Sequence, residues 1–150
     1  MNIRRAQPLD IPDILALMKL RHGQTPVAAI PISERDVCAL LLQLMQSAKG
    51  CVAVGEVDGA FTGAVVGGID RAWWSRKAIA QEIFLAAADG VSALPLAQYF
   101  REWAAKRPGV AAACLSTDHS LTVPEAMEGG FAVVGTMVAH VFKEVPHGTV

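Results

Sequence analysis

Apolar residues recur at helical spacing in three stretches of the chain. The first stretch follows Asp10, the second follows Ser33 and runs to Gly50, and the third covers residues 94–106. Within each stretch the apolar positions lie three or four residues apart, which is the period of one face of an α-helix. Asp and Ser favour a helix N-cap, and Pro108-Gly109 after the third stretch favours a helix end. The pattern predicts three amphipathic helices, each with one apolar face toward the core.

Strands are predicted where apolar and β-branched residues run or alternate between turn signals. These stretches are residues 2–7, 51–57, 60–69, 78–87, 110–115 and 131–143. Asp58-Gly59 separates the second from the third, and this dipeptide favours a two-residue hairpin between antiparallel strands. Glycines inside the third stretch predict a bulge or a close approach of other atoms to the backbone, at Gly63, Gly67 and Gly68.

A short helix over residues 124–128 completes the order β-α-α-β-β-β-α-β-α-β. It opens on Pro124 and ends at Gly129-Gly130. We expect a single domain over residues 1–150, because a chain of this length with 53% hydrophobic residues can bury roughly two thirds of its unfolded surface.

Cysteine usage and hydropathy predict a cytoplasmic protein. No apolar stretch is long enough to cross a membrane, and the N-terminus has no apolar segment of the kind found in signal peptides. The three cysteines are odd in number and unclustered, which favours free thiols over disulfides or a zinc site. The four histidines are also too scattered to predict a metal site.

The charge balance argues against nucleic acid and membrane partners. Thirteen basic and fourteen acidic residues leave a net charge of −1, so the chain has no global field that attracts a polyanion. One local cluster of cations surrounds Trp73-Trp74 and consists of Arg71, Arg76 and Lys77. This cluster is compatible with stacking of a base, or with a solvated turn that two indoles anchor.

Residues 83–93 have the pattern of a strand, a tight loop of small residues and a helix N-terminus. Such a loop directs successive backbone N–H groups at one point, where the helix dipole also favours an anion. The segment therefore predicts a pyrophosphate site, although Gly90 could equally serve only to turn the chain.

The order of elements, the hairpin 52–63 and the closing Gly130-Phe131 segment together resemble the GNAT superfamily of N-acetyltransferases. The hairpin VAVGEVDGAFTG is similar to the family's V-a-e-v-d-G-x-i-v-G, and GFAVVG is similar to its G-F-x-x-x-G. The resemblance implies an α/β (α+β) fold with a mixed, mostly antiparallel central sheet that splays open. It also implies an acyltransferase that moves an acetyl group from acetyl-CoA to a small-molecule or peptide amine.

The resemblance assigns acetyl-CoA to one strand end and the loop that follows. The cofactor-binding residues it implies are Phe84, Leu85, Ala86, Gly90, Val91, Ser92 and Ala93. The family's Q/R-x-x-G-x-G/A falls on residues 88–93, where only Ala93 agrees. Asp89 adds a negative charge beside the pyrophosphate, which would weaken binding about a hundredfold if it faces inward and little if it faces solvent.

The catalytic residues implied are Glu82 as the base that deprotonates the amine, with backbone N–H groups near Leu85 and Ala86 as donors to the oxyanion. The alternative for Glu82 is a solvent-facing carboxylate or a partner of Lys77 or Arg76. Ala126 replaces the tyrosine that usually acts as acid.

His119 or Ser120 could substitute for that acid, and the alternative for His119 is an exposed loop histidine. Asp118 and His119 point apart on an extended chain and form no dyad by themselves. Cys114 is predicted to be a core residue. The segment 21–31, which would wall the acceptor pocket, has no cluster of carboxylates.

The departures from the family's motifs also leave open a non-catalytic binding or interaction module on the same fold. In either case we expect a homodimer, because the final strand 131–143 is long and apolar and needs cover.

Overall fold

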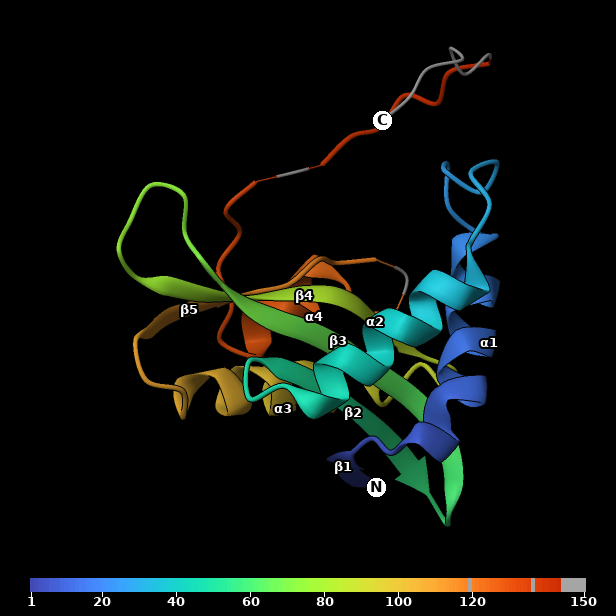
Figure 1. Ribbon diagram of the computed structural model, residues 1–150, viewed down its shortest axis with the longest axis horizontal. Helices are drawn as coiled ribbons and strands as arrows, with labels where there is room; N and C mark the ends of the chain where they lie inside the picture. The colour runs from blue at the N-terminus through green and yellow to red at the C-terminus, as the bar shows by residue number, and fades with distance from the viewer. Residues whose placement is uncertain (119, 136, 144–150) are drawn as a thin grey trace.

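The computed structural model describes residues 1–118, 120–135 and 137–143, and its centre is one five-stranded sheet (Figure 1). The strands are β1 (Asn2–Arg5), β2 (Gly50–Val57), β3 (Ala60–Arg71), β4 (Ala78–Ala87) and β5 (Val110–Cys114). They lie in the order β1-β2-β3-β4-β5; β1 to β4 pair antiparallel, and β5 is parallel to β4. The mixed, mostly antiparallel sheet that the sequence predicts is therefore confirmed.

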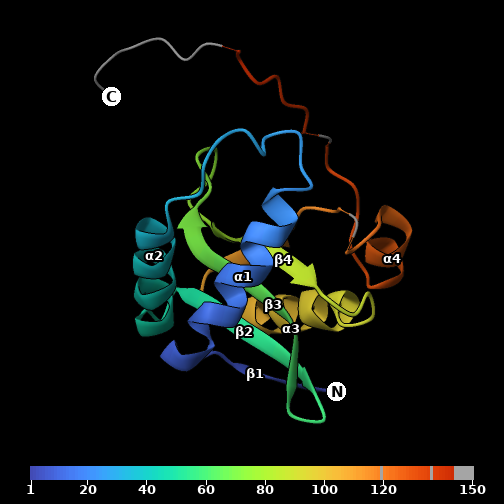
Figure 2. The ribbon, with the colours of Figure 1, turned by 90° about the vertical axis from the view of Figure 1, so that its right-hand side faces the viewer.

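Helices cover both faces of this sheet (Figure 2). They are the 3-10 turn η1 (Pro8–Asp10), α1 (Ile11–His22), α2 (Glu34–Gln46), α3 (Ala93–Ala105) and α4 (Val123–Glu128). Successive strand residues point to opposite faces, so Val52 packs with Ile14 of α1 and Leu41 of α2, whereas Ala53 packs with Leu96 and Phe100 of α3. The first nine elements appear in the predicted order.

Two local signals in the sequence lead to the predicted geometry. Asp58 and Gly59 have φ values of 51° and 78°, the left-handed conformations that a tight two-residue hairpin requires. Ser33 caps α2 by accepting a hydrogen bond from Asp36 N–H over 3.4 Å.

Asp10 does not cap α1 as expected. Its carboxylate accepts two hydrogen bonds of 2.8 Å from Arg4 and one of 2.7 Å from Gln7 N–H. A charged partner on β1 and a backbone donor at the start of η1 therefore compete successfully for this side chain, and α1 begins without a side-chain cap.

The predicted final strand over residues 131–143 is wrong for the residues that the structure describes there. After Phe131 the chain runs away from the sheet (Figure 1), and neither 131–135 nor 137–143 is in a strand. Five large apolar side chains along it are 61% to 95% exposed, namely Val133, Val134, Met137, Val138 and Phe142. An alternating pattern indicates the preference for a strand, but a strand forms only where an edge is available to pair with it.

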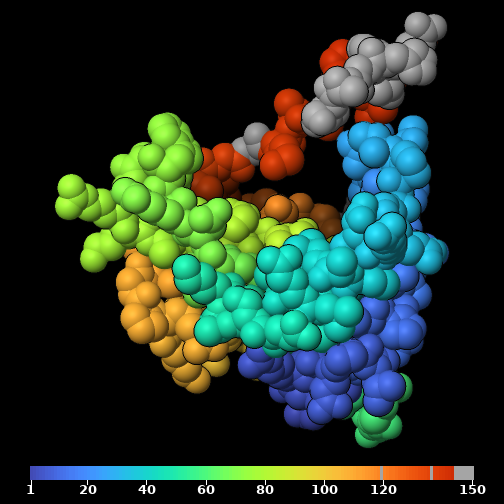
Figure 3. Space-filling view, viewed as in Figure 1, coloured from blue at the N-terminus to red at the C-terminus, as the bar shows by residue number. Residues whose placement is uncertain are grey.

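The two indoles of the β3–β4 turn do not anchor it. Trp73 and Trp74 are 91% and 64% exposed, and their rings meet edge to face with centroids 5.6 Å apart. In the space-filling view the turn projects from the body (Figure 3). Among the described residues, no helix has the length and hydropathy needed to cross a bilayer.

Gly67 is the point where α3 approaches the sheet most tightly. We expect Gly67→Ala to lower the free energy of unfolding by about 1–3 kcal/mol. An added Cβ would lie 2.5 Å from Phe100 Cε2 and 2.8 Å from the carbonyl oxygen of Gln81. Urea unfolding measures the change. Gly23→Ala is the control, because an added Cβ there meets only ordinary contacts of 3.5 and 3.6 Å at a φ of −61°, and it should not lower stability. Equal stability of the two variants would contradict this packing.

Candidate active site

The candidate site lies where β4 and β5 separate. The two strands pair from Ala78 and Val110 as far as Gln81 and Cys114, and β4 then continues to Ala87 without β5 beside it. On its other side, β4 stays paired with β3 except for a bulge that leaves Ile83 without a partner. The bulge bends β4 at the point where the sheet opens. The splayed sheet that the resemblance implies is therefore present.

The backbone edge of β4 that faces this opening is partly occupied. Ala88 N–H donates to Thr62 of β3 over 2.7 Å, so by alternation the N–H groups of Leu85 and Ala87 point the other way, into the opening. Ala87 N–H donates to Ser120 Oγ over 3.3 Å, and Ala87 C=O accepts from Arg21 Nη2 over 2.6 Å. Within the described chain, Leu85 N–H has no acceptor.

The two backbone N–H groups that were predicted to bind the oxyanion therefore point in opposite directions. Leu85 N–H faces the opening, whereas Ala86 N–H and Phe84 N–H face β3, which they reach through the pairs with Ala64 and Val66.

Glu82 sits at the apex of the opening and is only 8% exposed. Its Oε2 accepts a hydrogen bond of 2.8 Å from Ser116 N–H, on the segment that leaves β5. Burial raises the pKa of Glu82, and the hydrogen bond from Ser116 only partly opposes this effect. The structure excludes a solvent-facing carboxylate at this position, and Glu82 forms no ion pair with the described cations. A buried carboxylate with a raised pKa is suited to exchange protons near neutral pH.

The acid candidates lie on the loop after β5. His119 is outside the described residues. Ser120 is buried beside the β4 edge, where its hydroxyl accepts from Ala87 N–H and keeps its own proton to donate. Ala126 of α4 is buried in the core cluster of α3, so this position faces the protein interior. Cys114 is half-buried.

In the β4–α3 loop, backbone N–H groups bind the carboxylate of a residue of the same loop, Asp89. Asp89 Oδ1 accepts from the backbone N–H groups of Val91 and Ser92 over 3.0 and 2.9 Å, and Oδ2 accepts from Ser92 Oγ over 2.6 Å. Desolvation opposes the charge of Asp89, but these hydrogen bonds outweigh it and lower the pKa of the carboxyl. Asp89 is an exposed residue, but its carboxylate turns back onto the N–H groups of its own loop and does not extend away from them.

The residues that the resemblance assigned to acetyl-CoA thus fit one part of the cofactor and not another. Leu85 offers an open strand edge, which suits an extended chain that carries amide groups. The loop does not fit a pyrophosphate, because Asp89 occupies the N–H groups of Val91 and Ser92. Pro95 in the first turn of α3 has no N–H to add.

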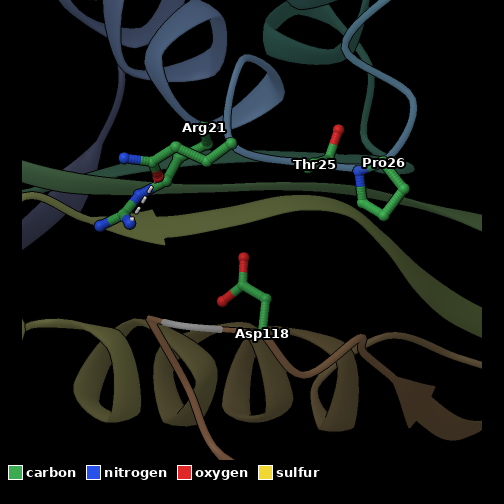
Figure 4. Close-up of a pocket in the computed structure, with 5 residues that line it drawn as sticks. Arg21, Thr25, Pro26 and Asp118 are labelled. Atoms are coloured by element: carbon green, nitrogen blue, oxygen red, sulfur yellow. Dashed lines mark hydrogen bonds between the residues drawn. The ribbon is translucent and has the colours of Figure 1, made fainter.

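A cavity of about 220 Å³ adjoins the opening (Figure 4). It is lined by Arg21, Gln24, Thr25, Pro26 and Asp118. In Figure 4 the Asp118 carboxylate points from the segment after β5 toward the wall formed by α1 and the residues after it. Segment 21–31, predicted to wall the acceptor pocket, supplies four of these lining residues. Asp118 was not predicted to line it, because nothing local in the sequence places this residue opposite Arg21.

Side chains that could together bind a metal ion do not gather in the described chain. The parts of the chain that the structure describes contain no group of three or more His, Cys, Asp or Glu side chains that could hold a metal ion.

Glu82 makes stability depend on pH in a defined direction. Because its pKa is raised in the folded state, the native protein binds more protons than the unfolded chain above the unfolded pKa of 4.5. Stability is therefore lost as pH rises from there through the folded pKa. Glu82→Gln removes this term and keeps an oxygen that can accept from Ser116 N–H. We expect urea unfolding to show the variant gaining stability relative to the parent between pH 4 and pH 8. The exposed Glu102→Gln is the control, and a relative loss for Glu82→Gln over that range would contradict the burial of a charged carboxylate.

No protein-family model matches the chain, and no curated protein matches it by sequence. Solved structures do share its architecture. An integron cassette protein from the mobile metagenome of Cole Harbour Salt Marsh matches 96% of this chain and 91% of its own with a TM-score of 0.71 and 15% identity. Glucosamine-6-phosphate N-acetyltransferase from Arabidopsis thaliana matches 95% of this chain and 98% of its own, with a TM-score of 0.67 and 8% identity.

An aminoglycoside acetyltransferase from an uncultured soil metagenomic sample matches 97% of this chain and 96% of its own, with a TM-score of 0.59 and 15% identity. The shared architecture extends over nearly the whole of each chain. The protein therefore has the fold of the GNAT N-acetyltransferases, in a divergent form.

Proposed function

We propose that the protein is an acyltransferase that moves an acetyl group from acetyl-CoA to an amine. The observation that carries the proposal is the buried Glu82 carboxylate at the apex of a sheet opening into which Leu85 N–H also points. The likeness to solved acetyltransferases supports the reaction class.

The proposed roles follow from the chemistry of acyl transfer. An amine attacks only after it loses a proton, and Glu82 accepts that proton directly or through water. The carbonyl oxygen gains negative charge as the N–C bond forms, and Leu85 N–H donates to it. Acetyl-CoA supplies an acetyl group that is already activated as a thioester. The chain needs no tyrosine at Ala126, because a thiol with a pKa of about 8.5 leaves as a thiolate at modest cost.

The acceptor side is proposed to be the cavity that Asp118 and Arg21 line. The Asp118 carboxylate supplies the negative charge that attracts an ammonium group, whether on a small molecule or on a peptide. The net charge of −1 gives nucleic acid no comparable attraction. We further propose a cytoplasmic location, because Cys38, Cys51 and Cys114 are all free thiols, as is usual in a reducing compartment.

One observation favours the alternative of a non-catalytic binding module on the same fold. Asp89 fills the loop on which the pyrophosphate of the cofactor would lie. An assay for acetyl transfer distinguishes the acyltransferase from the binding module.

Acetyl-CoA incubated with a panel of primary amines should yield acetylated products, detected by mass spectrometry and by release of free thiol. We expect Glu82→Gln to reduce the rate at pH 7 by about tenfold or more, and by less at pH 9, where amines deprotonate unaided. Glu102→Gln should keep the parent rate. Equal rates of Glu82→Gln and parent at both pH values would remove Glu82 from the mechanism, and the absence of product with every amine would favour the binding module.

We also propose a homodimer. In the described chain, β5 pairs only with β4 and has a free outer edge. Five large apolar side chains of residues 131–143 are exposed, as described above. A second copy offers each feature the partner it lacks, because two-fold symmetry presents the same edge and the same segment on both chains.

Sedimentation at tens of micromolar protein should give a mass near twice the 15.9 kDa of one chain. The double variant Val134→Lys/Val138→Lys should shift the protein toward one chain, because it places charges on the apolar segment. Trp73→Ser removes an equally exposed side chain elsewhere and should leave the dimer intact. A parent mass near 15.9 kDa would contradict the proposal.

A further inference from the structure

In the β4–α3 loop, the Asp89 carboxylate occupies N–H groups that a pyrophosphate would otherwise bind. We propose that Asp89 closes this loop to pyrophosphate, so that the acyl donor is recognised through its pantetheine arm and gains little from its nucleotide half. The proposal rests on the acyl-transfer function proposed above. It makes Asp89 a residue that determines donor specificity.

Asp89 already occupies hydrogen-bond donors of the loop. Five backbone N–H groups are present between Gly90 and Pro95, because proline lacks one. Asp89 takes those of Val91 and Ser92, and it also accepts from the Ser92 hydroxyl over 2.6 Å. Ser92 Oγ in turn lies 3.0 Å from Thr62 Oγ1 of β3, so the carboxylate is connected to the sheet. A pyrophosphate must displace this network or use the N–H groups that remain.

The charge of Asp89 also opposes a pyrophosphate. The hydrogen bonds to Asp89 favour its ionised form, so a carboxylate anion occupies the loop at neutral pH. Residues 88–93 include no lysine or arginine to offset it. The cation that contacts the end of β4 is Arg21, and its guanidinium is bound to Ala87 C=O and to Gln24 Oε1 over 2.6 and 3.2 Å. A second anion at the loop is therefore repelled with little compensation.

The pantetheine half of the donor still has a place to bind. The edge of β4 is open at Leu85, where the backbone N–H faces the opening without an acceptor in the described chain. Pantetheine is an extended chain with two amide groups, and such chains bind by pairing with an open strand edge. The pantetheine arm therefore meets an open strand edge, whereas the nucleotide half meets a loop that a carboxylate already occupies.

Calorimetric titration of the full chain with CoA and with pantetheine tests the proposal without turnover. For the parent protein we expect the two dissociation constants to agree within about threefold. Asp89→Ala frees both N–H groups and should tighten CoA binding by about tenfold or more, while pantetheine binding changes by less than about twofold. Asp70→Asn, at the opposite end of β3, removes one exposed charge and should change neither constant.

Asp89→Asn keeps an oxygen that can cap Val91 and Ser92 and removes only the charge, so it serves if the alanine variant does not fold. We expect it to tighten CoA binding by a smaller factor, and unchanged CoA binding in this variant would overturn the proposal. The proposal is also overturned if the parent binds CoA about tenfold more tightly than pantetheine, or if no variant binds either compound. If the binding results hold but no amine is acetylated, the donor specificity stands and the catalytic function fails.

Discussion

The separation of β4 from β5 is the constraint on which the rest of the molecule depends. A strand in the middle of a sheet ordinarily pairs along both edges, but β4 pairs with β5 only as far as Gln81. The bulge at Ile83 bends β4 away while its pairing with β3 continues to Ala87. The opening that results places Glu82 at its apex, turns Leu85 N–H toward it and starts α3 at its far end. The candidate base and the open strand edge therefore both lie at one irregularity in strand pairing, and the β4–α3 loop follows at the end of the same strand.

The part of the sheet around Glu82 matters for the stability of the fold as well as for the proposed chemistry. Gly67 lies opposite Glu82 in the sheet register, and the missing side chain lets Phe100 of α3 pack against the backbone there. Glu82 is only 8% exposed in the same part of the sheet, and its burial raises the pKa of the carboxyl. The fold accepts an unfavourable ionised group at the point where a proton acceptor is useful.

The sequence predicted the elements well because periodicity reports which face of an element is buried, and this holds for the first nine elements. It could not predict pairing, and so residues 131–143 have a strand pattern without a strand in the described residues. For the candidate site, too, the sequence indicates which residues are candidates, whereas their surroundings depend on the fold. Glu82 was identified by its place in the strand, but its burial and its hydrogen bond from Ser116 N–H depend on the fold. Which groups the Asp89 carboxylate binds depends on the loop backbone, and Asp118 and Arg21 line one cavity only because the fold brings them together.

The hydrogen bonds of Asp89 have a thermodynamic consequence for α3. A glycine-rich loop without an internal anion leaves its N–H groups to water and becomes ordered when a ligand arrives, at a cost in conformational entropy. Here Val91 and Ser92 are already fixed by a side chain of the same chain. The first turn of α3 is therefore ordered on folding, independently of any ligand. Removing the carboxylate would exchange a preorganised helix start for a loop whose order depends on what binds it.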